Sequence, residues 1–174
     1  MTQRVDLATV MDRLAVDEVV TGYAVAVDDG DWAAYRALFT AGGRADYSSA
    51  GGIEGPAAEV ADWLEETMKL FPVRQHLVVN RLIRLEDLGG SPGDRAEVQA
   101  DFLNPMRLAG PVETRPQEAG AAGAAAAAGA ALAGAPTAPN FVAAGRYAFL
   151  LARTAEGWRL TRVTVHEKWR HVSV

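Results

Sequence analysis

The chain of 174 residues contains no cysteine, and this absence removes several chemistries at once. Disulfide bonds, thiolate nucleophiles and cysteine-ligated metal sites are excluded, because each of them needs a thiol. Histidine is scarce as well. The three histidines, at positions 76, 166 and 171, include no i, i+4 pair of the kind that binds zinc on a helix. We therefore expect no bound metal.

Basic residues are in the minority, and long hydrophobic runs are missing. The chain has 17 Lys and Arg against 22 Asp and Glu, and a net charge of −5 argues against nucleic acid, whose phosphates need a basic surface. The N-terminus shows no leader pattern, and no window reaches the roughly 18 to 20 unbroken apolar residues of a membrane helix. We expect a cytoplasmic protein whose partner is a small molecule rather than a membrane or a nucleic acid.

Apolar residues, by contrast, are plentiful. They make up 49% of the chain, enough for one compact domain over residues 1–174. The first half has helical patterns: we predict a long helix over residues 6–28, a short one with Asp31 as N-cap, and a third with Pro56 in its first turn. A short strand is expected at residues 43–49, between the second and third helices.

The second half of the chain has the pattern of strands. Four long segments rich in β-branched and aromatic residues are joined through turn residues, which predicts an antiparallel meander. The segments are residues 74–87, 94–110, 140–154 and 157–171. Helices followed by a meander indicate the α+β class. We expect one curved antiparallel sheet whose concave side is closed by the helices.

Residues 118–140 form an Ala/Gly-rich insertion between two of these strands, and it is nearly free of charge. Internal glycines and the lack of a polar face disfavour a stable isolated helix, despite the high helix propensity of alanine. Two interpretations stay open: a loosely packed hairpin insertion, or a short helix that covers an opening or a neighbouring subunit. The segment has no reactive side chain and cannot carry chemistry.

An acidic residue falls on the inward face of the first predicted helix. Counted from Val20, the positions i+3, i+4, i+7 and i+8 share one helix face, and they hold Tyr23, Ala24, Val27 and Asp28. The first three residues suit a buried face. A carboxylate at the end of such a face is either a local cap of the following loop or a buried functional acid.

A histidine and an asparagine share one predicted face of the strand that begins at Arg74. Alternate residues of a strand point to the same side, so this face holds His76, Val78, Asn80 and Leu82. The opposite face is also largely apolar, although a sheet covered on one side needs only one such face. The second apolar face indicates a pocket or a subunit interface, with His76 and Asn80 as its polar points.

Four stretches of the chain together resemble one known family. In order, they are YAVAVDDGDWAAYRALF, RADY, RQHLVVN and GWRLTRVTVHEKW. Their order and spacing are similar to the SnoaL-like branch of the nuclear transport factor two-like superfamily, near scytalone dehydratase and bile acid 7α-dehydratase. The resemblance implies a cone-shaped, cystatin-like α+β barrel with a deep pocket, chemistry without a cofactor, and assembly as a homodimer or homotrimer.

The resemblance also implies roles for particular residues. Asp28 and His76 match the Asp–His dyad of both dehydratases, and Tyr23 matches the catalytic tyrosine of the bile acid enzyme. Tyr47 matches a pocket tyrosine of scytalone dehydratase. The substrate of that enzyme is not implied, because its second histidine, its serine and its asparagine are replaced in this chain by Met106 or Asn104, by Gly145 and by Tyr147.

These residue types suit proton transfer. A carboxylate that binds one imidazole nitrogen fixes the tautomer and raises the basicity of the other nitrogen, which can then remove a proton beside a carbonyl. Tyr23 or Tyr47 would donate to the developing enolate oxygen. Loss of a hydroxyl then gives dehydration, proton return to another carbon gives isomerisation, and attack on an internal carbonyl gives cyclisation. The expected substrate is a hydrophobic, polyketide- or steroid-like carbonyl compound.

Each assignment has a structural alternative. Asp28 can cap the helix end, His76 can be a wall residue, and the tyrosines can serve packing alone. Asn80, Arg162 and His166 complete the predicted substrate-binding set, although the parity of the strand that holds the last two is ambiguous. A non-catalytic binding or assembly module of the same fold is the alternative function. Epoxide hydrolysis is a third, but it needs an Asp-Arg-Asp arrangement that the sequence does not reveal.

Overall fold

The computed structural model of the chain describes residues 7–86, 89–109 and 138–173. Most of the predicted insertion at 118–140 lies outside these ranges, and so does the predicted start of the first helix at residue 6. In the described part of the chain, no helix is both long and apolar enough to cross a membrane.

Three α-helices occupy the first half, close to where the sequence predicts them. They are α1 (Leu7–Asp29), α2 (Trp32–Ala37) and α3 (Ala57–Met68). The side chain of Asp31 accepts a hydrogen bond of 2.8 Å from the N–H of Ala34, so Asp31 is the N-cap of α2, as predicted. Pro56 is the N-cap of α3 rather than a residue of its first turn.

One seven-stranded sheet, with a short 3-10 turn η1 (Ser48–Ala50), makes up most of the rest. Its order is β2-β1-β7-β6-β5-β3, with β4 also paired to β5. The strands are β1 (Phe39–Asp46), β2 (Glu54–Pro56), β3 (Val73–Arg74), β4 (Leu77–Glu86), β5 (Arg95–Arg107), β6 (Phe141–Thr154) and β7 (Gly157–Val172). The predicted meander is confirmed, since β4, β5, β6 and β7 pair antiparallel in succession.

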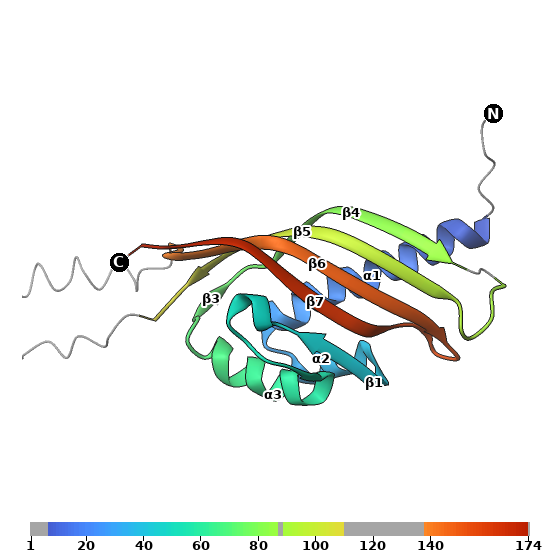
Figure 1. The fold of residues 1–174 in the computed structure, drawn as a ribbon, viewed down its shortest axis with the longest axis horizontal. Helices are drawn as coiled ribbons and strands as arrows, with labels where there is room; N and C mark the ends of the chain where they lie inside the picture. Colours follow the sequence, from blue (N-terminus) through green and yellow to red (C-terminus); the bar gives the residue numbers. More distant parts are fainter. Residues whose placement is uncertain (1–6, 87–88, 110–137, 174) are drawn as a thin grey trace, which may run out of the picture.

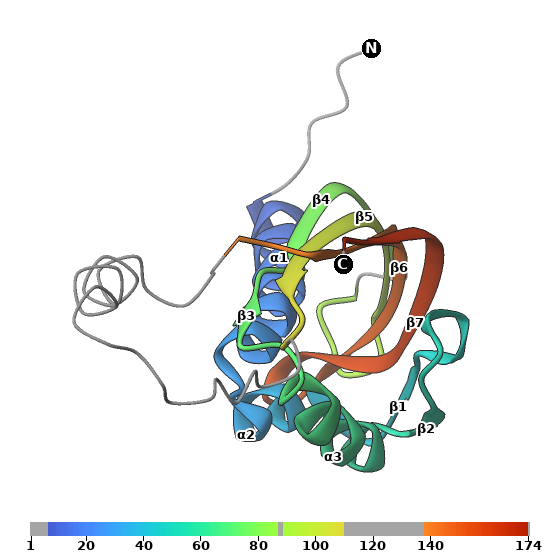
Figure 2. The ribbon, with the colours of Figure 1, turned by 90° about the vertical axis from the view of Figure 1, so that its left-hand side faces the viewer.

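The sheet is mixed rather than wholly antiparallel, because β1 runs parallel to β7. Figures 1 and 2 show how strongly it curls, with the long α1 along the inner side and α2 and α3 near one end. Helix α1 contacts both β4 and β7, while α3 contacts β1. The predicted α+β class, with helices against the concave side of a curved sheet, is therefore confirmed.

The inner face of α1 follows the spacing read from the sequence. Val16, Val20, Tyr23 and Val27 are almost completely buried. They pack with apolar residues of β5, β6 and β7 into a single core. Asp28 comes one residue after the last of them, at the end of α1, and its side chain is 22% exposed. The end of α1 therefore places the carboxylate of Asp28 at the edge of the core.

The predicted strand from Arg74 is broken twice, and this changes which side chains face inward. His76 lies in the gap between β3 and β4. Farther along, Asn80 has a φ of 52° and the register of β4 against β5 shifts between Val79 and Leu82. Such a bulge reverses the alternation of side chains. Val78 is buried but Asn80 and Leu82 are exposed, so the predicted shared face of His76, Val78, Asn80 and Leu82 is wrong.

Candidate active site

A cavity of about 250 Å³ lies where α3 and the end of α1 meet β5, β6 and β7. Its wall is mostly apolar and aromatic, as is usual for sites that take small hydrophobic ligands. The polar side chains on this wall are those of Tyr47, Thr67, His76, Asn104, Tyr147, Glu167 and Arg170. A larger depression of about 520 Å³ is lined by other residues of β4, β5, β6 and β7 and by Gly93, and no histidine or tyrosine is among them. The smaller cavity is therefore the candidate site.

Asp28 and His76 form a two-point contact at the wall of this cavity. Asp28 Oδ1 lies 2.6 Å from His76 Nδ1, and Asp28 Oδ2 accepts a 2.8 Å hydrogen bond from the main-chain N–H of His76. The His76 side chain is only 8% exposed. With Nδ1 held by the carboxylate, Nε2 is the ring nitrogen left for a ligand, and no partner for it occurs among the described residues.

The surroundings of Asp28 keep its carboxylate ionised. Partial burial by itself would raise its pKa, but the hydrogen bonds from the ring and the main chain of His76 oppose this. Together with the positive charge of Arg74, they hold the pKa of Asp28 below its ordinary value of 3.8. Asp28 is therefore a permanent anion behind His76 near neutral pH, where it can stabilise a proton gained by the ring.

Arg74 ties together the helix ends that frame the site. Its Nε donates 3.2 Å to the main-chain oxygen of Asp28, and its Nη1 donates 3.3 Å to the main-chain oxygen of Met68. Both oxygens lie at helix C-terminal ends, where carbonyls lack helical partners and a cation is favourable. Because Arg74 is only two residues from His76, this contact fixes the histidine's segment against α1.

Two tyrosines of the predicted site contact each other. The hydroxyl of Tyr23, on α1, is hydrogen-bonded to the hydroxyl of Tyr47, which follows β1. Tyr47 lies on the cavity wall, whereas Tyr23 does not line the cavity and is 1% exposed. Burial raises the pKa of both hydroxyls well above the ordinary value of 10.0, so both stay protonated. Tyr47 can therefore donate to a ligand, with Tyr23 behind it.

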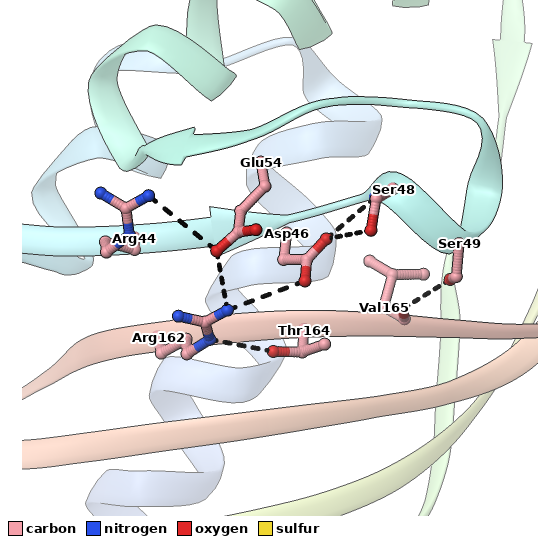
Figure 3. Close-up of polar contacts among 8 residues, drawn as sticks. All are labelled: Arg44, Asp46, Ser48, Ser49, Glu54, Arg162, Thr164 and Val165. Atoms are coloured by element: carbon pink, nitrogen blue, oxygen red, sulfur yellow. Dashed lines mark hydrogen bonds and ion pairs between the residues drawn. The ribbon is translucent and has the colours of Figure 1, made fainter.

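Three predicted substrate-binding residues lie outside the cavity. Asn80 is exposed, and its Nδ2 donates 3.1 Å to Asp101 on the neighbouring strand. Arg162 forms a 2.9 Å ion pair with Glu54 and a 3.7 Å pair with Asp46, as Figure 3 shows. His166 is also exposed and does not line the cavity. Two register shifts account for these positions. The bulge in β4 reverses the inward and outward alternation at Asn80, and a shift between Leu150 and Leu151 of β6 against β7 does the same before Arg162.

Besides Thr67, four polar residues of the wall were not among the predicted site residues. Asn104 and Tyr147 occupy inward positions of β5 and β6, and simple alternation with Phe102 and Met106 would have placed Asn104 on the inner face. Glu167 and Arg170 belong to β7. They are three residues apart and both line the cavity, which regular alternation does not allow. A register shift between Ala144 and Gly145 of β6 explains it.

Glu167 and Arg170 form a two-point ion pair at one side of the cavity. Arg170 Nε and Nη2 lie 2.6 Å and 2.8 Å from the two oxygens of Glu167. Arg170 Nη2 also donates 2.9 Å to the main-chain oxygen of Ala50 in η1. Because their charges cancel, this pair leaves the cavity suited to an uncharged ligand. Within the described ranges, no three histidine, aspartate or glutamate side chains gather as metal ligands would.

The curled sheet of this chain, closed by helices around an apolar cavity, has the architecture of a small-molecule-binding α+β cone. The chain belongs to the SnoaL-like domain family, whose sequence profile matches residues 8–164. The family resemblance inferred from the sequence is therefore confirmed. An uncharacterized protein of Mycobacterium tuberculosis is 30% identical over 104 residues, which are 60% of this chain and 67% of that protein.

Solved structures share the fold at low sequence identity. The hexachlorocyclohexane dehydrochlorinase LinA-type3 of Novosphingobium barchaimii is 14% identical, with a TM-score of 0.67 over 97% of this chain and 94% of its own. A protein of Novosphingobium aromaticivorans, provisionally assigned as a scytalone dehydratase, is 14% identical, with a TM-score of 0.64 over 95% and 89%. At such identities the likeness concerns the fold alone.

Proposed function

We propose that this protein is a cofactor-free lyase or isomerase that removes a proton beside a carbonyl group of a hydrophobic substrate. The contact between Asp28 and His76, with the histidine on the wall of an apolar cavity, carries this proposal. A histidine whose Nδ1 is bound by a partly buried carboxylate is held in one tautomer and can act as a general base through Nε2.

The neighbouring groups fit the steps that follow. Once His76 Nε2 takes the proton, negative charge develops on the carbonyl oxygen, and Tyr47 is a protonated donor on the same wall. Tyr23 holds the hydroxyl of Tyr47 and acts as its positioning residue. The resulting enolate can expel a leaving group, take the proton back on another carbon, or attack a second carbonyl within the same molecule.

The names of the structural neighbours support elimination over the other outcomes. A dehydrochlorinase and a provisionally assigned dehydratase both remove a small molecule from a substrate. The neutral Glu167–Arg170 pair and the apolar wall support an uncharged, polyketide- or steroid-like substrate. Assembly as a homodimer or homotrimer and a cytoplasmic location stay predictions of the sequence.

The test uses a bicyclic ketone, 2-tetralone, in D2O. NMR measures the rate at which the protons beside its carbonyl exchange for deuterium, which reports proton abstraction. The wild type should speed this exchange, and Asp28→Asn or His76→Ala should each lower the rate by roughly 10²-fold, the effect of losing a general base. The double variant should lose little more, because residues that act as a unit are not additive. Asn80→Ala, on the outer face, is the control and should keep the wild-type rate.

Circular dichroism must show that each variant is folded. Equal exchange rates for the wild type and the double variant would contradict the proposal and would favour a non-catalytic binding module of the same fold.

A further inference from the structure

Asn104 and Tyr147 place an incompletely satisfied polar pair on the apolar wall of the cavity. Asn104 is 4% exposed and Tyr147 is 2% exposed, and both line the cavity. Asn104 Nδ2 donates 3.2 Å to the hydroxyl oxygen of Tyr147. Asn104 Oδ1 has no partner, and no acceptor for the Tyr147 proton occurs among the described residues.

An unpaired amide oxygen in this position lowers stability, since burial removes it from water without a replacement hydrogen bond. Its neighbours on the same face of β5 are Phe102 and Met106, which shows that apolar side chains fit this wall. Packing therefore does not require an asparagine at position 104. A ligand that completes its hydrogen bonds accounts for a polar residue here.

The unused groups define the chemistry of that ligand. Asn104 Oδ1 can accept a hydrogen bond, and the Tyr147 hydroxyl can donate one. The complementary ligand group is therefore one whose single polar atom both donates and accepts a hydrogen bond. A hydroxyl does this, whereas a carbonyl would leave Oδ1 unsatisfied and an ether would have no proton to give. The last side-chain torsion of asparagine is soft, so Oδ1 can turn toward a ligand in the cavity.

The pair also lies next to the dyad. Arg74 pairs with Met106 on one side of the gap between β3 and β4, and Leu77 pairs with Leu103 on the other side. The two pairings belong to one continuous register, which places His76 across from Asn104. A hydroxyl bound by Asn104 is thus within the part of the cavity where His76 would act.

We propose that Asn104 and Tyr147 form a subsite for a substrate hydroxyl, which makes the substrate class a hydroxylated carbonyl compound. This rests on the proposed function, and it selects dehydration among the three outcomes. His76 takes a proton from the carbon beside the carbonyl, the electron pair forms the new carbon–carbon double bond, and the carbon–oxygen bond breaks. The departing hydroxyl takes up the proton from His76 and leaves as water, so His76 returns to its neutral form.

Equilibrium binding of three probes tests the subsite separately from catalysis. The probes are 2-naphthol, 2-methoxynaphthalene and naphthalene, which share a bicyclic body and differ in the hydroxyl. The wild type should bind 2-naphthol about fivefold to tenfold more tightly than the other two, the gain expected for one net hydrogen bond. Asn104→Leu should bind all three about equally, and Tyr147→Phe should reduce the preference.

Asp28→Asn separates the two proposals. It should keep the preference for 2-naphthol even if it abolishes proton abstraction, because the subsite does not use Asp28. Failure of 2-naphthol to bind the wild type, or an unchanged preference in a folded Asn104→Leu variant, would overturn the subsite. The melting temperature of the ligand-free Asn104→Leu/Tyr147→Phe double variant gives a second readout. A value equal to or above that of the wild type is expected, and a lower value would show that the pair is structural.

Discussion

Arg74 Nε donates a 3.2 Å hydrogen bond to the main-chain oxygen of Asp28. Arg74 comes two residues before His76, the candidate base, so it binds the backbone of the residue whose carboxylate contacts that base. The same guanidinium reaches Met68 at the end of α3. One side chain therefore connects α1, α3 and the segment before β4. The alignment of Asp28 with His76 depends on this connection as well as on their own hydrogen bonds.

Replacing Arg74 by methionine should keep the apolar stem and remove these bonds. We expect proton abstraction to fall about tenfold, since small displacements of catalytic groups are costly, with a loss of about 1–2 kcal/mol in the free energy of unfolding. Arg84→Met, on the exposed part of β4, is the matched control and should change neither quantity. Exchange rates and urea unfolding measure both. An Arg74→Met variant with the wild-type rate would show that the connection does not position the dyad.

The lowered pKa of Asp28 should appear in the pH dependence of stability. A carboxyl whose pKa is lower in the folded state contributes stability above its unfolded pKa, here near 3.8, and loses it as the pH falls through the folded value. The stability difference between the wild type and Asp28→Asn should therefore shrink between about pH 5 and pH 3. Urea unfolding across this range measures it, with the exposed Asp29→Asn as control. A difference that stays constant with pH would contradict the assigned contacts.

Removing the hydroxyl of Tyr47 should affect turnover more than binding. Tyr47→Phe leaves the ring in contact with Trp63 but removes the donor on the cavity wall, so we expect kcat to fall by about 10- to 100-fold with little change in KM. Tyr23→Phe should have a smaller effect, because Tyr23 touches the ligand only through Tyr47. Steady-state kinetics on a substrate that is turned over will test this. A larger loss in Tyr23→Phe would reverse the two roles.

Asn80 should matter for the fold rather than for the reaction. Its φ of 52° is in the left-handed region, which asparagine and glycine adopt easily and β-branched residues do not. We expect Asn80→Gly to be nearly neutral and Asn80→Val to lower the free energy of unfolding by about 1–2 kcal/mol. Both should keep the wild-type exchange rate. A raised KM in Asn80→Gly would restore the substrate-binding role predicted from the sequence.

Much of the fold was accessible from local patterns. The spacing of Val20, Tyr23 and Val27 identified the inner face of α1, and Asp31 marked the start of α2. These features depend on residues close in the chain, so their physical causes are present in a short window of sequence. The family resemblance added the pairing of Asp28 with His76, which are separated by 48 positions and which periodicity alone does not connect.

The wall of the cavity depended on tertiary structure. A single bulge reverses every later side chain of a strand, and three shifts of register, in β4 and between β6 and β7, decided which of Asn80, Arg162, Glu167 and Arg170 face inward. Bulges form where strand pairing, sheet curvature and packing agree, and those involve partners far away in the sequence. Local patterns in the sequence therefore predicted the three helices and the four long strand segments, and the family resemblance pointed to Asp28 and His76. Which polar groups share the cavity with His76 depended on the pairing and curvature of the folded sheet.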